Sequence, residues 1–293
     1  MSVFFIFAKN QDSMIAVIGA DGFLGRRMAE RLWEMECRIL TFGRDLDEFF
    51  RFLPSHYQEL EWVLYVDRRV PDSTTSLFRM EYVQKLWTLS ASYSLPLLYA
   101  FHQPTDLFYS DFHSNHFPEW TRRQYRKPPF WYIFKASEVY GPGESSSGEL
   151  VSRVYAFYQQ IKETGELVIP QPKGVDLEVG EARDYLYVQD AVRVFLWFLR
   201  HRPANGVYDL GSGFERTDSA VAHAIFRALK CVPKIRYVAH SSTAMDKIDS
   251  PFLPDLRDLR RTGYKKPFFS VEMGLKSSLR KRKVPQIPLD SDC

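Results

Sequence analysis

A glycine turn of the form Gly-x-x-Gly-x-x-Gly, at residues 19–25, constrains the fold of this 293-residue chain more than any other feature. An apolar segment, residues 15–18, comes directly before it, and apolar side chains recur at helical spacing over residues 22–35. A strand, a glycine turn and an amphipathic helix in this order are typical of a dinucleotide-binding site, where the backbone approaches a pyrophosphate at the start of the helix. We therefore predict that the cofactor contacts Gly19, Gly22, Phe23, Leu24 and Gly25.

The end of the second predicted strand, residues 37–42, bears on the choice of cofactor. An acidic residue at this place usually holds the ribose hydroxyls of NAD. Here Arg44 follows the strand after Gly43, and Asp45 comes next. A guanidinium suits a 2′-phosphate, so we favour NADP, with NAD held by Asp45 as the alternative. A surface arginine without a cofactor role is the other interpretation of Arg44.

Short apolar segments alternate with helical patterns up to Tyr140. Strands are predicted at 14–18, 37–42, 62–66, 97–101 and 131–134, and a helix at 78–94. This alternation predicts an α/β fold, a Rossmann-type doubly wound parallel sheet. The interval between Phe42 and Trp62 is short for a full strand and helix, so we expect one unit of the sheet to be reduced.

The pattern changes after residue 140 and predicts a smaller α/β substrate-binding lobe. We assign residues 14–140 to the dinucleotide-binding domain, with 184–205 returning to it, and residues 141–183 and 206–279 to the smaller lobe. Predicted helices cover 150–164, 190–200, 219–229 and 271–279, and Asp190 is predicted to cap the second of these. Residues 1–13 are a dispensable extension or follow a misplaced start, and residues 280–293 form a basic tail. A cleft between the lobes is the expected ligand position.

Composition excludes several classes of protein. The net charge of +3 is too small to indicate a nucleic-acid partner, and no apolar run approaches the roughly eighteen residues that span a membrane. The three cysteines, Cys37, Cys231 and Cys293, are widely spaced and indicate neither a disulfide framework nor a metal site. We therefore expect a cytoplasmic protein.

Later segments carry a resemblance to a known family. They are Glu-Val-Tyr-Gly-Pro at 138–142, Arg-Asp-Tyr-Leu-Tyr-Val at 183–188, Gly-Val-Tyr-Asp-Leu-Gly-Ser-Gly at 206–213, and the closing segment at 255–268, which ends in Gly-Tyr-Lys-Lys-Pro-Phe. With the glycine turn, they make the chain similar to the extended short-chain dehydrogenases/reductases. More narrowly, the chain resembles the ADP-L-glycero-D-manno-heptose 6-epimerases of lipopolysaccharide core synthesis.

The resemblance implies a nucleotide-sugar substrate, bound NADP that takes hydride from a sugar carbon and returns it, and a homo-oligomer of undetermined size. It also implies two substrate contacts. Arg183 matches an arginine expected to bind the nucleotide diphosphate, with an ion pair to Asp184 or Glu181 as the alternative role. Glu138 stands where the family has an asparagine.

The family's acid/base pair, Tyr-x-x-x-Lys, does not occur between Tyr99 and Lys135. Counting back from residues 140–142 by the family's usual separation reaches Tyr109, with His113 in the place of the lysine. We predict these two as the catalytic residues, and a loop tyrosine without a catalytic role is the alternative. The Ser/Thr pair after the preceding strand is also replaced, by Phe101 and His102. A second hypothesis is therefore a non-catalytic relative that binds a nucleotide sugar or a protein partner.

Overall fold

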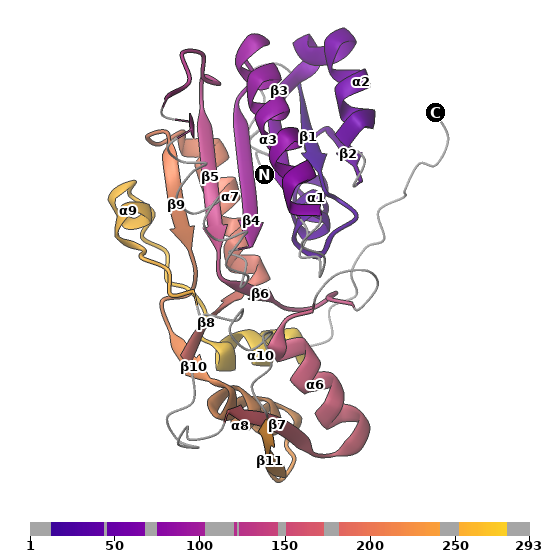
Figure 1. Ribbon diagram of the computed structural model, residues 1–293, viewed down its shortest axis with the longest axis vertical. Coiled ribbons are helices and arrows are strands. Elements are labelled where there is room, and N and C mark those ends of the chain that lie inside the picture. Colours follow the sequence, from indigo (N-terminus) through magenta and orange to yellow (C-terminus); the bar gives the residue numbers. More distant parts are fainter. Residues whose placement is uncertain are drawn as a thin grey trace, which may run out of the picture.

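The computed structural model describes residues 13–43, 46–67, 75–102, 120–121, 123–145, 151–172, 182–240 and 252–279. Within these residues the chain forms a larger and a smaller lobe (Figure 1). The larger lobe is built on a six-stranded sheet of described strands in the order β2-β1-β3-β4-β5-β9, and all neighbouring strands are parallel. These strands are β1 (Met14–Ile18), β2 (Ile39–Phe42), β3 (Leu60–Val66), β4 (Leu97–His102), β5 (Trp131–Ala136) and β9 (Gly206–Leu210).

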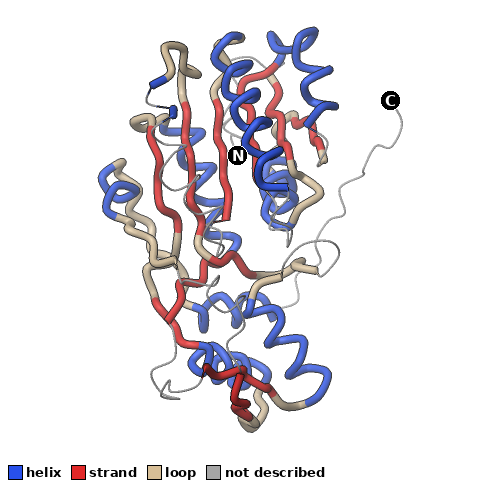
Figure 2. Tube along the Cα trace, in the orientation of Figure 1, coloured by secondary structure: helices blue, strands red, loops and turns tan. Residues whose placement is uncertain are grey.

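Alternate residues of β1 belong to two different hydrophobic cores, because side chains of a strand point to opposite faces of the sheet. Ile15 and Val17 pack on the face covered by α1 (Phe23–Glu34) and α7 (Val188–His201). Ala16 and Ile18 pack on the other face with α2 (Leu46–His56) and α3 (Thr75–Ser92). Helices therefore lie on both sides of the sheet (Figure 2), and the predicted doubly wound fold is confirmed.

The strand order agrees with the prediction that one unit is reduced. Dinucleotide-binding folds built from two complete halves have the order 3-2-1-4-5-6. Here the segment between β2 and β3 holds only α2 and a short 3-10 turn, η1 (Tyr57–Glu59), and the chain then crosses β1 to form β3 on its other side. Among the described strands β2 is therefore the edge. The order still reverses between β1 and β3, where ligands bind in folds of this type.

The smaller lobe lies below the larger one in Figure 1. In its described part, β6 (Glu138–Tyr140), β8 (Ala182–Tyr187) and β10 (Glu215–Thr217) form a sheet in the order β10-β8-β6, and β7 (Leu167–Pro172) pairs with β11 (Ile235–His240). The helices of this lobe are α6 (Arg153–Thr164), α8 (Asp218–Leu229) and α10 (Val271–Leu279), whereas α9 (Arg257–Arg261) packs beside β9. No described helix is both long and apolar enough to cross a membrane.

Three details differ from the expected arrangement. β9 pairs with β5 from Gly206 to Leu210, so residues 206–210 lie in the larger lobe. β8 pairs with β6 and β10, so the chain returns to the larger lobe at α7 rather than at residue 184. The predicted cap Asp190 lies inside α7, which begins at Val188 and has Tyr187 as its N-cap. The predicted cap was wrong because the backbone N–H of Phe269, far away in sequence, binds the Asp190 carboxylate.

Candidate functional site

The glycine turn lies at the point where the strand order reverses. Gly19 has a φ of 81°, and a Cβ there would lie 2.1 Å from the carbonyl oxygen of Val66 at the end of β3. A Cβ at Gly25 would lie 2.1 Å from the carbonyl oxygen of Gly19, so α1 packs directly on the turn. Both positions admit only glycine, and the turn closes through a hydrogen bond from the N–H of Gly22 to Gly19.

The start of α1 is suited to an anion. Its N-cap is Gly22, no described side chain caps it, and its first turn has no acidic residue. The N-termini of α6 and α8, by contrast, are capped by the hydroxyls of Ser152 and Thr217. Because a helix N-terminus carries partial positive charge and exposes N–H groups, the start of α1 fits a pyrophosphate.

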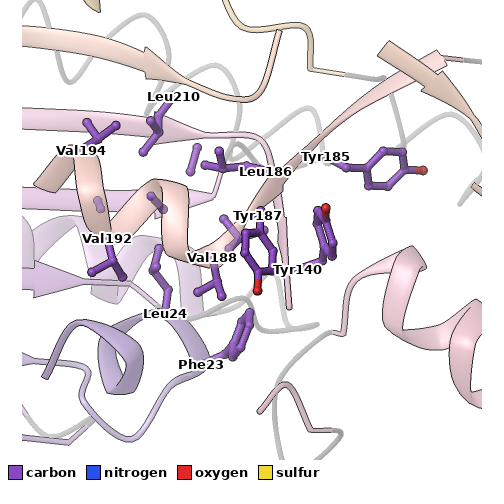
Figure 3. Close-up of a cluster of buried hydrophobic side chains, with 14 of the residues drawn as sticks. Phe23, Leu24, Tyr140, Tyr185, Leu186, Tyr187, Val188, Val192, Val194 and Leu210 are labelled. Carbon is purple, nitrogen blue, oxygen red and sulfur yellow. The ribbon is translucent and has the colours of Figure 1, made fainter. Parts of the chain in front are cut away.

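Phe23 and Leu24 use their side chains for packing. Both are buried, and Figure 3 shows them in the same cluster as Tyr187 and Val188. Only their backbone is therefore suited to contact a cofactor.

Asp67 follows β3 beside the turn, at a place where the sequence has an acidic residue instead of the small residue usual in this family. It is 7% exposed, its N–H donates to Ala100 at 2.8 Å, and its carboxylate accepts from the Tyr65 hydroxyl at 3.5 Å. A buried carboxylate here repels phosphate and can accept from a ribose hydroxyl. The predicted residues Arg44, Tyr109 and His113 lie outside the described residues.

On the substrate side, Arg183 and Asp184 are neighbours on β8, so their side chains point to opposite faces of the sheet and have different surroundings. Asp184 is buried and accepts from the hydroxyls of Ser137 and Ser212 and from the N–H groups of Ser212 and Gly213. Arg183 is 7% exposed. The expected structural role of Asp184 is therefore supported, and the alternative pairing of Arg183 with Asp184 or Glu181 stays a prediction. Glu181, the other expected partner, lies outside the described residues.

Arg183 faces a cluster of charged groups around Tyr185. The Tyr185 hydroxyl donates to Asp218 at 3.2 Å, and Arg153 forms an ion pair with the same carboxylate at 2.8 Å. Burial raises the pKa of Tyr185, the carboxylates of Glu138 and Asp218 raise it further, and Arg153 and Arg183 oppose them. Two guanidinium groups thus lie near one phenol, at the N-termini of α6 and α8, an arrangement that can bind an anionic group.

Two carboxylates meet at the N-terminus of α6. Glu138 accepts from the backbone N–H of Arg153, and Glu144 accepts from the N–H of Ser152 and, at 2.9 Å, from its hydroxyl. Burial raises the pKa of Glu144 to about 7, and the Ser152 hydrogen bonds oppose this shift. Of these residues, Glu138 was predicted from the sequence as a substrate contact, whereas Glu144, Arg153 and Asp218 were not. The Ser152 cap before an amphipathic helix was the available signal.

The closing segment that carries the family resemblance packs on the larger lobe. The Asp190 carboxylate pairs with Arg193 and accepts from the N–H of Phe269 at 2.6 Å. Burial raises its pKa, and these two partners oppose the shift. Tyr264 makes an edge-on contact with Trp197 of α7. Within the described residues, the closing segment and Phe269, which follows it, are therefore held against α7.

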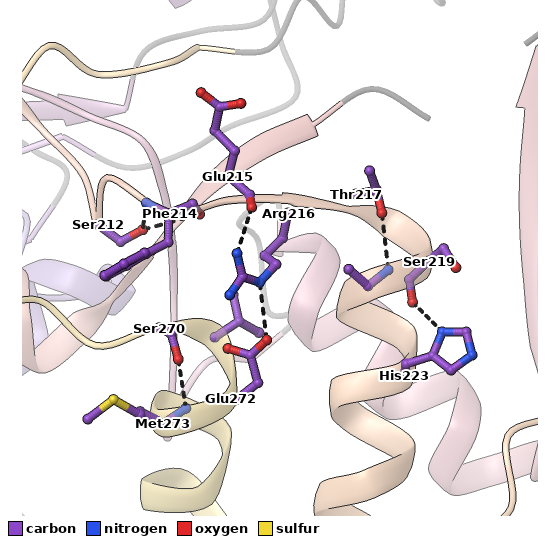
Figure 4. A network of polar contacts seen from close by, with 12 residues as sticks. Ser212, Phe214, Glu215, Arg216, Thr217, Ser219, His223, Ser270, Glu272 and Met273 are labelled. Carbon is purple, nitrogen blue, oxygen red and sulfur yellow. Dashed lines mark hydrogen bonds and ion pairs between the residues drawn. The ribbon is translucent and has the colours of Figure 1, made fainter. Parts of the chain in front are cut away.

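A polar network joins β10 to α10 and α8 (Figure 4). Arg216 donates to Glu272 of α10 at 3.1 Å and to the carbonyl of Glu215. Thr217 then caps α8 through the N–H of Ala220 at 3.2 Å. Arg216 lies directly opposite Arg183 in the β-ladder and forms an ion pair with Glu272 of α10.

Comparison with known proteins agrees with this geometry. Residues 109–211 match the model of the NAD dependent epimerase/dehydratase family. A 141-residue stretch is 31% identical to the ADP-L-glycero-D-manno-heptose-6-epimerase of Alkalilimnicola ehrlichii, and the match covers 48% of this chain. It covers only 44% of that relative, so the chain matches less than half of the relative's length.

Solved structures named as members of such enzyme classes share the fold at low identity. The ADP-L-glycero-D-manno-heptose-6-epimerase of Helicobacter pylori superposes with a TM-score of 0.75 at 14% identity, covering 95% of this chain and 98% of that one. The UDP-glucose 4-epimerase of Thermus thermophilus in complex with NAD gives 0.68 at 15%, covering 90% and 97%. A GDP-L-fucose synthetase from Naegleria fowleri bound to NADP gives 0.66 at 13%, covering 93% of both chains. Both forms of the cofactor thus occur on this fold.

Proposed function

We propose that this chain is an NAD(P)-dependent nucleotide-sugar epimerase, related to the ADP-heptose 6-epimerases and acting in the cytoplasm on a lipopolysaccharide core precursor. The glycine turn is the observation that supports this proposal most. It lies where the strand order reverses, and neither Gly19 nor Gly25 has room for a Cβ atom. The uncapped start of α1 suits the pyrophosphate of a dinucleotide.

The residues have separate proposed roles. The backbone of residues 19–25 would hold the pyrophosphate, and Arg44 the 2′-phosphate of NADP, with NAD as the alternative. Bound nicotinamide would supply reversible acceptance of hydride. Arg183 would bind the substrate diphosphate, with Glu138 beside it. Tyr109 and His113 would move the proton at the sugar carbon.

Cofactor occupancy tests the turn directly. The purified protein is denatured and the released nucleotide identified by mass spectrometry. We expect NADP or NAD near one per chain, and loss of it in Gly22→Asp, because the added carboxylate would meet the pyrophosphate. Val232→Asp is the matched control, since it adds the same carboxylate at a side chain that is 79% exposed, after the end of α8. Unchanged occupancy in Gly22→Asp would contradict the assignment of the site.

A second candidate is a relative that binds a nucleotide sugar or a protein partner without redox chemistry. The absence of a Tyr-x-x-x-Lys pair between Tyr99 and Lys135, and Phe101 and His102 in place of the Ser/Thr pair, favour it. Epimerisation at C6 of ADP-heptose, followed by NMR, separates the two. We expect activity that disappears in Tyr109→Phe and persists in Tyr125→Phe, where the substituted tyrosine is fully exposed. Such a result rules out the second candidate, whereas substrate binding without turnover supports it.

A further inference from the structure

Two arginines of α1 reach across to the loop that leads into the smaller lobe. The Nε of Arg27 donates to the carbonyl of Pro142 at 2.8 Å, and a second N–H of the same guanidinium donates to the same oxygen. Arg26 donates to the carbonyl of Gly143 at 2.5 Å. Glu30 pairs with Arg27 and orients it. The helix that begins at the glycine turn is thus bonded to residues 142–143.

The loop is shaped to receive this guanidinium. Gly143 has a φ of 86°, and a Cβ there would lie 2.0 Å from a terminal nitrogen of Arg27. Any other residue would both strain the backbone and displace the arginine. Arg27 is only 15% exposed, so its two bonds to Pro142 are shielded from water and stronger than surface bonds.

The next residue of the loop continues the chain of contacts to the candidate substrate site. Glu144 holds the N–H and hydroxyl of Ser152, which caps α6. Arg153 follows and pairs with Asp218, which also binds Tyr185 next to Arg183. A shift of residues 142–144 would therefore move the start of α6.

We propose that Arg27 is a positioning residue that couples occupancy of the glycine turn to the placement of α6 in the substrate lobe. An anion at the start of α1 restrains that helix, and Arg27, one turn further on, passes the restraint to Pro142 and from there to the Ser152 cap. The coupling rests on the proposed function, because the ligand of the turn is taken to be a dinucleotide.

Hydrogen exchange measured by mass spectrometry tests this on the full-length protein, without ligand and with NADP or NAD. The variants are Arg27→Ala and Gly143→Ala, which disturb the contact from opposite sides. Arg31→Ala is the control, since Arg31 lies on the same helix and is exposed, and its only side-chain ion pair within the described residues is with Glu34. Thermal unfolding of each variant verifies folding.

Without ligand, we expect exchange in residues 141–155 to be about ten-fold faster or more in both test variants and unchanged in Arg31→Ala. With cofactor, wild-type protein should gain protection at residues 19–27 and at 141–155, and Arg27→Ala only at 19–27.

Equal protection of residues 141–155 in Arg27→Ala and wild type, with or without cofactor, would overturn the proposal. Protection of wild-type residues 19–27 alone contradicts the coupling and leaves the proposed function standing. Absence of any protection by NADP or NAD in wild type contradicts the proposed function, and the coupling to a dinucleotide with it.

Discussion

The carboxylate of Asp184 on β8 accepts a hydrogen bond from the hydroxyl of Ser137, with 2.7 Å between the oxygens. Ser137 joins β5 of the larger lobe to β6 of the smaller one, and its own N–H donates to Leu210 at the end of β9. The same carboxylate binds Ser212 and Gly213 after β9. One buried side chain therefore joins the two sheets at the boundary of the lobes.

Replacing Asp184 by alanine should lower the free energy of unfolding by about 3 kcal/mol or more, because several buried donors would lose their acceptor. Urea denaturation followed by fluorescence measures this. Asp255→Ala, which removes an exposed carboxylate paired only with Arg257 within the described residues, should change the midpoint little. Equal midpoints for wild type and Asp184→Ala would contradict the central role of this carboxylate.

Glu144 should make stability depend on pH. Its pKa is raised from 4.5 to about 7 in the folded protein, chiefly by burial. Between these values the folded state holds a proton that the unfolded state has lost, so this contribution is present below about pH 4.5 and lost as the pH rises through 7. The loss is on the order of 3 kcal/mol.

Denaturation of wild type and Glu144→Gln at about pH 5 and about pH 8 measures the contribution. Wild type should lose stability relative to the variant at the higher pH, because glutamine does not titrate. Glu163→Gln is the control, because Glu163 is exposed and lies on α6, the helix whose N-cap Ser152 binds Glu144. A wild-type-minus-variant difference that stays constant between the two pH values would rule out the raised pKa.

Removal of the hydroxyl group should change the stability of the protein in opposite directions at two buried tyrosines. The Tyr264 hydroxyl has no hydrogen-bond partner among the described residues, whereas that of Tyr185 binds Asp218. Tyr264→Phe should therefore stabilise the protein by about 1 kcal/mol, and Tyr185→Phe should destabilise it by a similar amount. Calorimetric melting of both variants decides this, and a lower melting temperature in Tyr264→Phe would reveal a partner for that hydroxyl.

Arg183 should contribute to binding of a diphosphate. Arg183→Ala is expected to weaken binding of ADP by about ten-fold to a hundred-fold, the effect of losing a charged hydrogen bond. Arg216→Ala is the control, because Arg216 lies opposite on β10 and pairs with Glu272. Isothermal titration calorimetry measures both. Similar affinities in the two variants would remove Arg183 from the proposed site.

Local features of the chain were predictable from sequence. The strand at residues 14–18 and the helix at 271–279 have the predicted bounds, and the glycine turn lies between the predicted strand and helix. Such features depend on the periodicity of neighbouring side chains and on glycine conformations, and both are written in a short stretch of sequence. The reduced unit between β2 and β3 was likewise visible as a short interval.

The fold class, the glycine turn and the family resemblance were therefore predictable from the amino-acid sequence alone. The three-dimensional arrangement was needed to show that β9 completes the larger sheet, that Asp190 binds Phe269 instead of capping α7, and that Glu138 holds the start of α6. It also brought Arg27 to Pro142, 115 residues away. These pairings join segments far apart in sequence, and their partners are selected by packing and by the need to satisfy buried polar groups, which no local pattern records.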